Sequence, residues 1–266
     1  MQYGFIGVGN MGGALAQAVC RRVDPAAVAV SGRRAEKAQE TARRLGCRAA
    51  ANEDIARECG VIFLGVKPQM MAEMLRPLQG IFAAREEKPL LVSMAAGLTL
   101  ADIGEMAGGG LPVVRIMPNT ACTVGEGMIL YCAGEGVGVE QLRCLLDALG
   151  PAGILDELPE SQIDAGSAVA GCGGAFADLF LEALADGGVY CGLPRERARL
   201  YAAQMLKGAA AMALTGTEHT GQSKDAVCSP GGTTIAGVRA LERGGFRSCA
   251  MEAVIAAYER TAALKK

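Results

Sequence analysis

Short apolar runs alternate with amphipathic stretches through the first 160 residues of the chain. The amphipathic stretches have the helical period, as in residues 35–45, which end at Gly46, and residues 140–149, which end at Gly150. Seven apolar runs have the length expected of buried strands, namely residues 3–8, 27–31, 61–66, 90–95, 113–117, 128–132 and 153–158. Strands that alternate with helices predict an α/β domain over residues 1–160, with a mostly parallel sheet between layers of helices.

The pattern changes after Pro159, where strand-like runs give way to long alanine-rich stretches with helical spacing. These stretches are residues 175–185, 195–214 and 246–264. In the last stretch an apolar residue recurs at every fourth position, at Phe246, Ala250, Val254 and Tyr258. This spacing is typical of a helix with one buried face. Residues 161–266 are therefore predicted to form an all-α domain. Helices this apolar have more surface to bury than one small bundle can cover, so we expect copies of the chain to associate.

The composition is that of a globular protein, since 51% of the 266 residues are hydrophobic, 20% are charged and the net charge is −2. A chain with this net charge does not attract a polyanion. Only 4% of the residues are aromatic and none is Trp, so there are few surfaces on which bases could stack. No nucleic-acid partner is therefore expected. Ten cysteines without a C-x-x-C pair, and His219 as the single histidine, argue against a disulfide framework or a metal site. We expect reduced thiols, no metal and a cytoplasmic location.

The first 20 residues carry no charge, which raises the question of a signal peptide. They lack a basic start, and Gly4, Gly7, Gly9, Gly12 and Gly13 would disrupt a helix there. Elsewhere no uncharged apolar run reaches the roughly 18 residues that a membrane span needs. No membrane role is expected.

A glycine motif follows the first predicted strand and opens the first helix. Its six residues are Gly7, Val8, Gly9, Asn10, Met11 and Gly12, a G-x-G-x-x-G sequence. In such a motif the first glycine allows a tight turn, the second lets the backbone approach a pyrophosphate and the third lets helix and strand pack closely. The free N–H groups at the helix N-terminus attract the anion. The motif predicts a Rossmann-type dinucleotide site rather than a purely structural turn.

The end of the second predicted strand indicates which dinucleotide binds. An acidic residue there would accept hydrogen bonds from a ribose 2′-hydroxyl, but the chain has Ser31, Gly32, Arg33 and Arg34. A hydroxyl and two guanidinium groups suit a 2′-phosphate, so NADPH is favoured, with NADH as a weaker possibility. The alternative is a solvated loop with ordinary surface arginines.

One segment of the helical half is not helical in character: Ser229, Pro230, Gly231, Gly232, Thr233 and Thr234, followed by a helical run that stops at Gly244 and Gly245. A Gly-Gly turn that enters a helix exposes backbone N–H groups, and the flanking hydroxyls add donors. The segment could therefore hold a small carboxylate. A capped turn between helices explains the same residues equally well.

Motifs in both halves resemble the pyrroline-5-carboxylate reductase family, whose members catalyse the last step of proline synthesis. In the helical half the resemblance lies in Asp225-Ala226-Val227, Ser229 through Ile235, Leu241-Glu242, Gly244-Gly245-Phe246-Arg247, Ala183 through Val189 and Gly192-Leu193-Pro194. In the first half it lies in Val66-Lys67-Pro68, Ala95-Ala96-Gly97 and Arg115 through Thr120. The resemblance spans nearly the whole chain.

The resemblance implies a Rossmann domain followed by a helical domain that forms a homodimer, and NAD(P)H-dependent reduction of 1-pyrroline-5-carboxylate to L-proline. It implies a carboxylate site at Ser229, Gly231, Gly232, Thr233 and Thr234, with Thr234 nearest the ring nitrogen as the catalytic residue. It further implies that the nicotinamide lies against Asn52, Ala95, Ala96 and Gly97, and that Val66, Lys67 and Pro68 border the adenosine half. Asn52 could instead be the N-cap of the next helix.

Positions that differ from the family pattern bear on the substrate. Residues 170–176 replace the family's serine-rich run with Ala-Gly-Cys-Gly-Gly-Ala-Phe, and Ala121 stands where a proline is usual. His219 precedes Thr220 instead of the family's proline, and a structural role is favoured over catalysis for it.

Alternative functions follow from these differences. One is reduction of a related cyclic imine, and another is a catalytically silent regulator that binds NADPH. A β-hydroxyacid dehydrogenase is disfavoured, because such an enzyme needs a lysine early in the helical half and the chain has none between Lys88 and Lys207.

Overall fold

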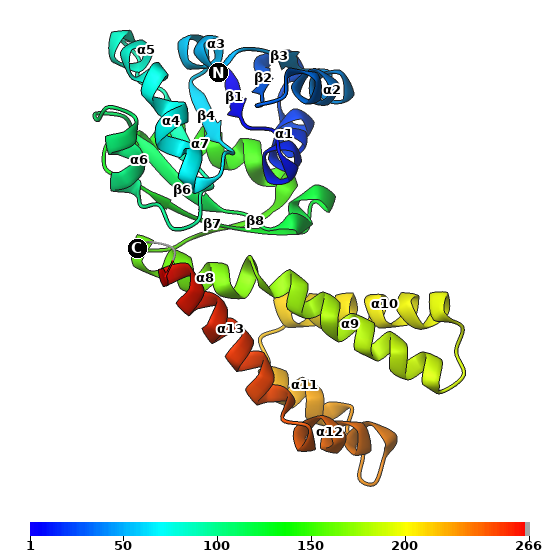
Figure 1. Cartoon of the computed structure of the whole chain (residues 1–266). Helices are drawn as coiled ribbons and strands as arrows, with labels where there is room; N and C mark the ends of the chain where they lie inside the picture. Colours follow the sequence, from blue (N-terminus) through cyan, green and yellow to red (C-terminus); the bar gives the residue numbers. More distant parts are fainter. Residues whose placement is uncertain (264–266) are drawn as a thin grey trace. The chain divides into compact units, whose positions relative to one another are not determined.

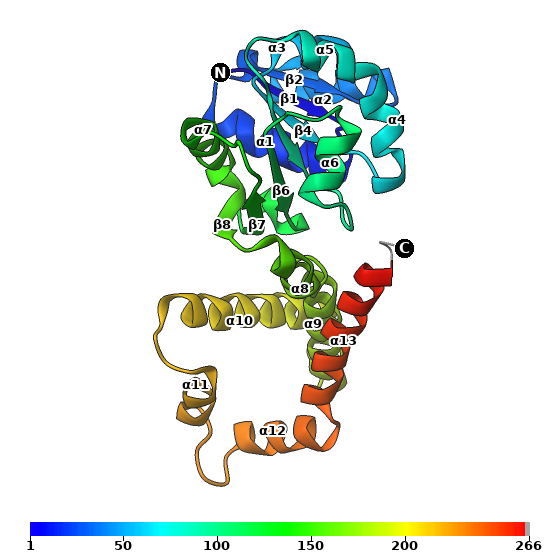
Figure 2. The ribbon, with the colours of Figure 1, turned by 90° about the vertical axis from the view of Figure 1, so that its left-hand side faces the viewer.

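The computed structural model describes residues 1–263 and divides the chain into two compact units (Figures 1 and 2). The first unit is Met1–Cys172 together with the chain from Ala257, and the second is Gly173–Ala256. Residues 264–266, where the last predicted helix was expected to end, lie outside the described part.

The first unit contains an eight-stranded sheet in the order β3-β2-β1-β4-β5-β6-β7-β8. Neighbouring strands are parallel except β6 and β7, which are antiparallel. The strands are β1 (Tyr3–Ile6), β2 (Val28–Ser31), β3 (Arg48–Ala49), β4 (Val61–Leu64), β5 (Leu90–Ser93), β6 (Val113–Met117), β7 (Gly127–Ala133) and β8 (Gly153–Glu157). The seven predicted strands are confirmed. The sequence did not predict β3, because its two residues are exposed and form no apolar run.

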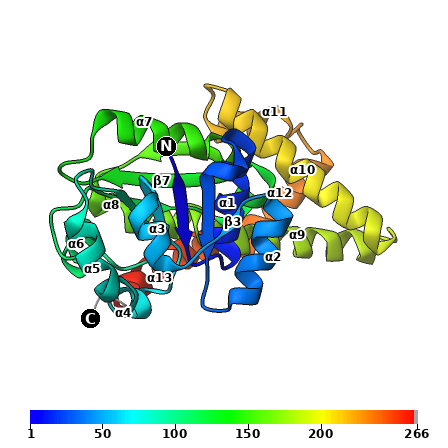
Figure 3. The same ribbon diagram turned by 90° about the horizontal axis from the view of Figure 1, so that it is seen from above.

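Helices cover both faces of this sheet. The helices of the unit are α1 (Asn10–Arg22), α2 (Ala35–Leu45), α3 (Asn52–Glu58), α4 (Met71–Leu75), α5 (Gln79–Ala84), α6 (Leu100–Met106), α7 (Val139–Leu149) and α8 (Glu160–Ala170). Short 3₁₀ turns lie at Pro25–Ala27, Pro68–Met70, Arg76–Leu78, Thr120–Val124 and Gly150–Ala152. One core cluster joins the sheet to α1, α2 and α7, and another joins the opposite face to α3, α4, α5 and α6. Figure 3 shows α1 and α3 on opposite sides of β1.

The central strands are buried on both faces, as their apolar sequences require. Phe5 on β1 and Phe63 on β4 are register partners, and their rings stack with centroids 4.3 Å apart. Each large apolar side chain that is buried in this way contributes about 1.5–3 kcal/mol to folding. The sheet and the helices on its two faces therefore form the main apolar core of the first unit.

A buried ion pair attaches α8 to the sheet. Arg115 on β6 is 1% exposed, and its Nη2 lies 2.5 Å from Oδ1 of Asp164 on α8. Its Nη1 lies 3.8 Å from Oε1 of Glu160, which also accepts a hydrogen bond from Leu100 N at the start of α6. The prediction placed α8 in the second domain, whereas the structure includes it in the first unit. These charges are the physical reason, because they fix α8 against β6.

The second unit is helical, as predicted. Its helices are α9 (Gly173–Tyr190), α10 (Arg195–Thr215), α11 (Thr220–Ala226), α12 (Thr233–Arg243) and α13 (Phe246–Ala263), the last of which continues into the first unit. α9 packs against α10, and the two helices come close together at Gly188, where an added Cβ would lie 3.1 Å from Cβ of Ala198. The rings of Phe180 and Phe246 join α9 to α13 at 5.2 Å between centroids.

This second unit lacks a core of its own. Among its residues the structure buries only Ala185, Ala198 and Ala202. Large apolar side chains instead face solvent, for example Tyr190 at 93% exposure and Leu214 at 73%. An exposed apolar surface of this kind marks a place that another surface covers.

Within the described residues, one helical stretch, Glu160–Tyr190, is long and apolar enough to cross a membrane. Length and composition are the only grounds for that assignment, and the core helix of a soluble protein meets the same criteria. The stretch is also interrupted by a turn at residues 171 and 172. It is weak evidence for a membrane span.

We expect Arg115→Ala to destabilise the protein by about 3–5 kcal/mol, because it leaves two carboxylates without the buried charge that they face. Urea unfolding followed by circular dichroism at fixed protein concentration measures this loss. Arg22→Ala is the matched control: it breaks an exposed pair with Asp147, 2.8 Å apart, and should cost less than about 1 kcal/mol. Equal losses for the two variants would contradict the role given to Arg115.

Candidate functional site

The glycine motif forms a turn that no residue with a side chain could make. Gly7 has φ +102°, and a Cβ on Gly12 would lie 2.2 Å from the carbonyl oxygen of Gly7. A Cβ on Gly65, which follows β4, would lie 2.3 Å from the same oxygen. The backbones of β1, α1 and the end of β4 therefore touch. Gly65 was not predicted, although its position directly after a buried strand could have indicated it.

Gly9 differs from its neighbours, because a Cβ there would meet nothing within 4 Å. Gly9 is the N-cap of α1, where no side chain caps the helix and no acidic residue lies in the first turn. The first N–H groups of a helix have no partner within the helix and carry partial positive charge. The residues present thus fit an anionic pyrophosphate.

Cationic residues surround this turn. A cavity of about 440 Å³ is lined by Gly9, Arg33, Arg34, Lys37 and Lys67, among others, and no acidic residue lines it. Lys37 was not predicted; it lies three residues after Arg34, in the first turn of α2, on the same side of that helix. The charges suit a phosphate group next to the pyrophosphate.

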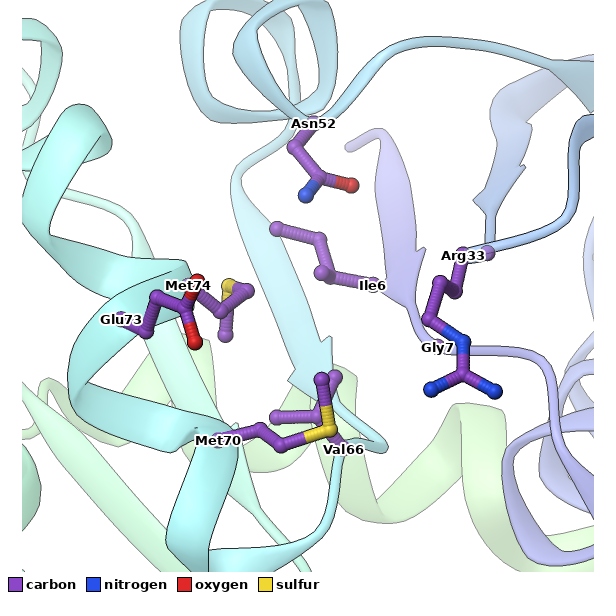
Figure 4. Close-up of a pocket in the computed structure, with 9 residues that line it drawn as sticks. Ile6, Gly7, Arg33, Asn52, Val66, Met70, Glu73 and Met74 are labelled. Carbon is purple, nitrogen blue, oxygen red and sulfur yellow. The ribbon is translucent and has the colours of Figure 1, made fainter.

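A second cavity of about 270 Å³ shares Gly7, Gly32, Arg33, Val66 and Met70 with the first. Figure 4 shows Arg33 on one side of this cavity and the α4 residues Glu73 and Met74 on the other. Methionine side chains and Val66 give it apolar walls that suit a purine ring. The sequence analysis did not identify Met70, Glu73 and Met74. The only clue to them in the sequence is that they follow β4.

Asn52 lies on the wall of the smaller cavity. Its Oδ1 accepts a hydrogen bond of 2.6 Å from the hydroxyl of Ser31, and it lines the same cavity as Arg33. Asn52 is the first residue of α3, whose N-cap is Ala51, so the N-cap interpretation was wrong. Ala95, Ala96 and Gly97 are not among the residues that line this cavity, and the expected place of Asn52 against the nicotinamide stays a prediction.

Ser31 was expected to bind the 2′-phosphate directly. That expectation stays a prediction. Ser31 is 4% exposed and lines a further cavity together with Gly32 and Asn52. Its hydroxyl is within hydrogen-bond distance of Asn52 and of the Phe5 carbonyl oxygen. We therefore infer that Ser31 positions Asn52.

The remaining predicted cofactor residues lie in loops after β4 and β5. Val66 lines both cavities and Lys67 lines the larger one, while Pro68 begins the following 3₁₀ turn. Ala95 is buried and Gly97 has φ +80° in the loop after β5, next to β4 in the sheet. The ends of β1, β4 and β5 thus lie side by side, where parallel sheets of this type bind nucleotides.

The segment that enters α12 lies in the second unit. Gly231 has φ +69°, which favours glycine. A Cβ on Gly232 would lie 2.4 Å from the hydroxyl oxygen of Ser229, which can rotate away, and 3.1 Å from its carbonyl oxygen. Gly232 is the N-cap, and no side chain caps the helix that begins with Thr233 and Thr234. A turn capped by a side chain is therefore not what the structure contains. The first N–H groups of α12 are available to an anion.

His219 caps a different helix, α11. Its Nδ1 accepts a hydrogen bond of 3.0 Å from Gly221 N, and its own N–H donates to Oε1 of Gln222 at 3.0 Å. These bonds give the histidine a structural function, as the sequence favoured.

The glycine turn at an uncapped helix N-terminus, next to a cationic cavity and a more apolar one, is typical of a Rossmann-fold dinucleotide-binding protein. Residues 2–97 match a family model described as "NADP oxidoreductase coenzyme F420-dependent". Residues 160–264 match the model "Pyrroline-5-carboxylate reductase dimerisation".

Full-length relatives agree with these matches. The chain is 37% identical to pyrroline-5-carboxylate reductase 3 of Danio rerio, over 98% of this chain and 90% of that protein. It is 38% identical to pyrroline-5-carboxylate reductase of Pisum sativum, over 97% and 94%. The crystal structure of Plasmodium falciparum pyrroline carboxylate reductase with NADP bound superposes with a TM-score of 0.90 at 33% identity, covering 100% and 98%. The chain belongs to the pyrroline-5-carboxylate reductase family, and its cofactor is NADP(H).

We expect the double variant Arg33→Ala, Arg34→Ala to raise KM for NADPH by about 10- to 100-fold, because each charge-assisted hydrogen bond contributes roughly 1.5–3 kcal/mol. KM for NADH should change by less than about threefold, since NADH lacks the 2′-phosphate. Adding Lys37→Ala should widen the difference. Arg43→Ala, at the other end of α2, is the control and should alter neither KM. An equal loss for both cofactors would contradict the assignment.

Proposed function

We propose that the protein uses NADPH to reduce the cyclic imine 1-pyrroline-5-carboxylate to L-proline. The observation that carries this proposal is the uncapped N-terminus of α12, which follows Ser229, Gly231 and Gly232 in the chain. The same chain has a dinucleotide site and belongs to the pyrroline-5-carboxylate reductase family. Among the named relatives, pyrroline-5-carboxylate reductases from an animal and a plant match nearly the whole chain.

The substrate carboxylate binds at the start of α12. The backbone N–H groups after Gly232 point along the helix axis, and the hydroxyls of Ser229 and Thr233 add donors. The helix dipole favours a negative charge at this end. An anion held by several donors has little rotational freedom, which orients the ring for reaction.

Reduction of the imine needs a hydride on carbon and a proton on nitrogen. Bound NADPH supplies the hydride. The protonated imine is already electrophilic, so the segment from Ser229 to Thr234 needs no strong acid and contains no titratable side chain. Thr234, in the first turn of α12, orients the ring through its hydroxyl, which accepts a hydrogen bond from the N–H of the protonated imine. After hydride transfer the nitrogen has a lone pair, and the hydroxyl relays a proton from water to it.

The helical unit supports assembly into a homodimer. Its large apolar side chains are exposed and only three alanines are buried, so a second copy of the unit is needed to give it a core. The match of residues 160–264 to a dimerisation model supports the same assembly. The ten free cysteines fit a reducing compartment, and we place the enzyme in the cytoplasm.

We expect NADPH oxidation on addition of 1-pyrroline-5-carboxylate, followed at 340 nm, with L-proline as the product identified by mass spectrometry. Thr234→Val should lower kcat by about 10- to 100-fold, the range typical of a lost proton-transfer group, with KM for NADPH unchanged. Thr261→Val is the control, because its hydroxyl only donates to the Ala257 carbonyl within α13.

Other outcomes of this assay select the alternatives. Turnover that is faster with a six-membered or substituted cyclic imine would identify a related reductase, and tight NADPH binding without any imine-dependent oxidation would identify a regulator. Either result would overturn the proposed substrate.

We expect Met205→Glu to weaken the dimer, because a charge placed on an apolar helical face must be desolvated when that face is covered. Met205 lies in the middle of α10 and is 48% exposed in the single chain. Light scattering after size-exclusion chromatography should show a shift of mass from dimer towards monomer. Val139→Glu, at an 87% exposed apolar position of the first unit, is the matched control and should leave the mass unchanged. An intact dimer in the Met205 variant would exclude this face from the interface.

A further inference from the structure

The loop that follows β5 begins beside the buried Arg115. Ser93, the last residue of β5, is the register partner of Arg115 on β6 and is fully buried. The hydroxyl oxygen of Ser93 accepts a hydrogen bond of 3.3 Å from Ala95 N. The chain then turns at Ala96, which is exposed, and at Gly97, which has φ +80°. The start of this loop is therefore fixed, while its turn is exposed.

Two carboxylates fix the end of the same loop. Thr99, the N-cap of α6, forms a capping box with Asp102, in which Thr99 N donates to Oδ2 at 2.8 Å and Asp102 N donates to Oγ1 at 3.1 Å. The first N–H of the helix, that of Leu100, donates to Oε1 of Glu160 at 2.7 Å. Glu160 is the first residue of α8 and lies 60 positions further along the chain. The capping box is local, whereas Glu160 attaches the end of the loop to another helix.

The N-terminus of α6 differs in this respect from the N-termini of α1 and α12. No side chain caps α1 or α12, so their first N–H groups are available to an anion. In α6 the N–H groups of Leu100 and Asp102 already donate to side chains of the protein. The negative charge of Glu160 also lies at the positive end of α6 and in the first turn of α8, where both helix dipoles stabilise it. The N-terminus of α6 therefore holds the loop instead of binding an anion.

Arg115 fixes the position of Glu160. Its Nη1 lies 3.8 Å from Oε1 of Glu160, and its Nη2 lies 2.5 Å from Oδ1 of Asp164, one turn further along α8. The side chain of Arg115 is 1% exposed and that of Glu160 is 33% exposed, so solvent screens their attraction only in part. Both ends of the loop are thus fixed beside the same arginine, the start through Ser93 and the end through Glu160.

We propose that Glu160 is a positioning residue, which holds the loop of Ala95, Ala96 and Gly97 in place for the nicotinamide ring. The proposal rests on the expected place of the nicotinamide against this loop, and it is independent of which imine the enzyme reduces. A loop that is fixed at both ends does not have to be ordered when the cofactor binds, so binding loses less conformational entropy. Removal of the Glu160 carboxylate frees the end of the loop and weakens binding of the nicotinamide half.

The experiment compares two ligands of the full-length protein by isothermal titration calorimetry. One is NADPH, and the other is adenosine 2′,5′-bisphosphate, which lacks the nicotinamide half. We expect Glu160→Ala to raise Kd for NADPH about 10-fold, the effect of one lost hydrogen bond to a charged acceptor, and Kd for the bisphosphate by less than about twofold. The bisphosphate should be unaffected because no residue of the loop lines the cationic cavity around Arg33 and Arg34. Glu160→Gln keeps an oxygen that accepts from Leu100 N and should bind NADPH within about threefold of the wild type.

Two further variants serve as controls. Asp164→Asn is the matched control, because it weakens the same ion pair without removing the acceptor of Leu100 N. It should lower the stability measured by urea unfolding and leave Kd for NADPH unchanged. Ala96→Gln adds bulk without charge at the exposed turn, so it tests the place of the nicotinamide itself and should weaken NADPH alone. Far-ultraviolet circular dichroism checks that each variant is folded.

Several results would overturn the proposal. Equal weakening of both ligands by Glu160→Ala would mean that Glu160 only stabilises the first unit. A loss of NADPH affinity in Asp164→Asn as large as that in Glu160→Ala would assign the effect to the ion pair. An unchanged Kd in Glu160→Ala together with a raised Kd in Ala96→Gln would show that the loop meets the nicotinamide without help from Glu160. Ala96→Gln without effect on either ligand would remove the nicotinamide from this loop. No imine is present in these measurements, so their outcome is separate from that of the proposed substrate.

Discussion

The dinucleotide site depends on the contact of three backbone segments at the carbonyl oxygen of Gly7. Gly12 and Gly65 each approach this oxygen so closely that a single added carbon would collide with it. Without side chains at these positions, α1 starts directly against the ends of β1 and β4. Its uncapped N-terminus then lies at the edge of the sheet where the two strands end, and the rest of the cofactor site is arranged around it.

The two units reach stability in different ways. The first buries its strands between two layers of helices and pairs its one large buried charge, Arg115, with carboxylates of α8. The second presents apolar side chains to solvent and has almost no buried residue. A helical unit built like this depends on association for its stability, so the folding of the enzyme and its assembly are thermodynamically linked.

Charge is distributed along the cofactor site in a way that matches its ligand. Arg33, Arg34, Lys37 and Lys67 line the larger cavity without an acidic residue, while Glu73 lines the smaller, more apolar one. The hydroxyl of Ser31 donates a hydrogen bond to Asn52, which lines the smaller cavity. Under the proposed function, the second anion site, at α12, would use backbone N–H groups and hydroxyls in place of charged side chains. Recognition of the highly charged cofactor would then be separate from recognition of the small carboxylate.

The sequence by itself determined the strand and helix pattern, because strands buried on both faces are continuous apolar runs and a glycine motif has one conformation at a strand end. It also predicted which residue types would meet the anions. Only the tertiary structure decided that Lys37, Glu73 and Gly65 join the site, that α8 belongs to the first unit and that Asn52 bonds Ser31. These are contacts between segments far apart in the chain or between side chains whose direction depends on packing, and the local sequence pattern by itself does not specify such contacts.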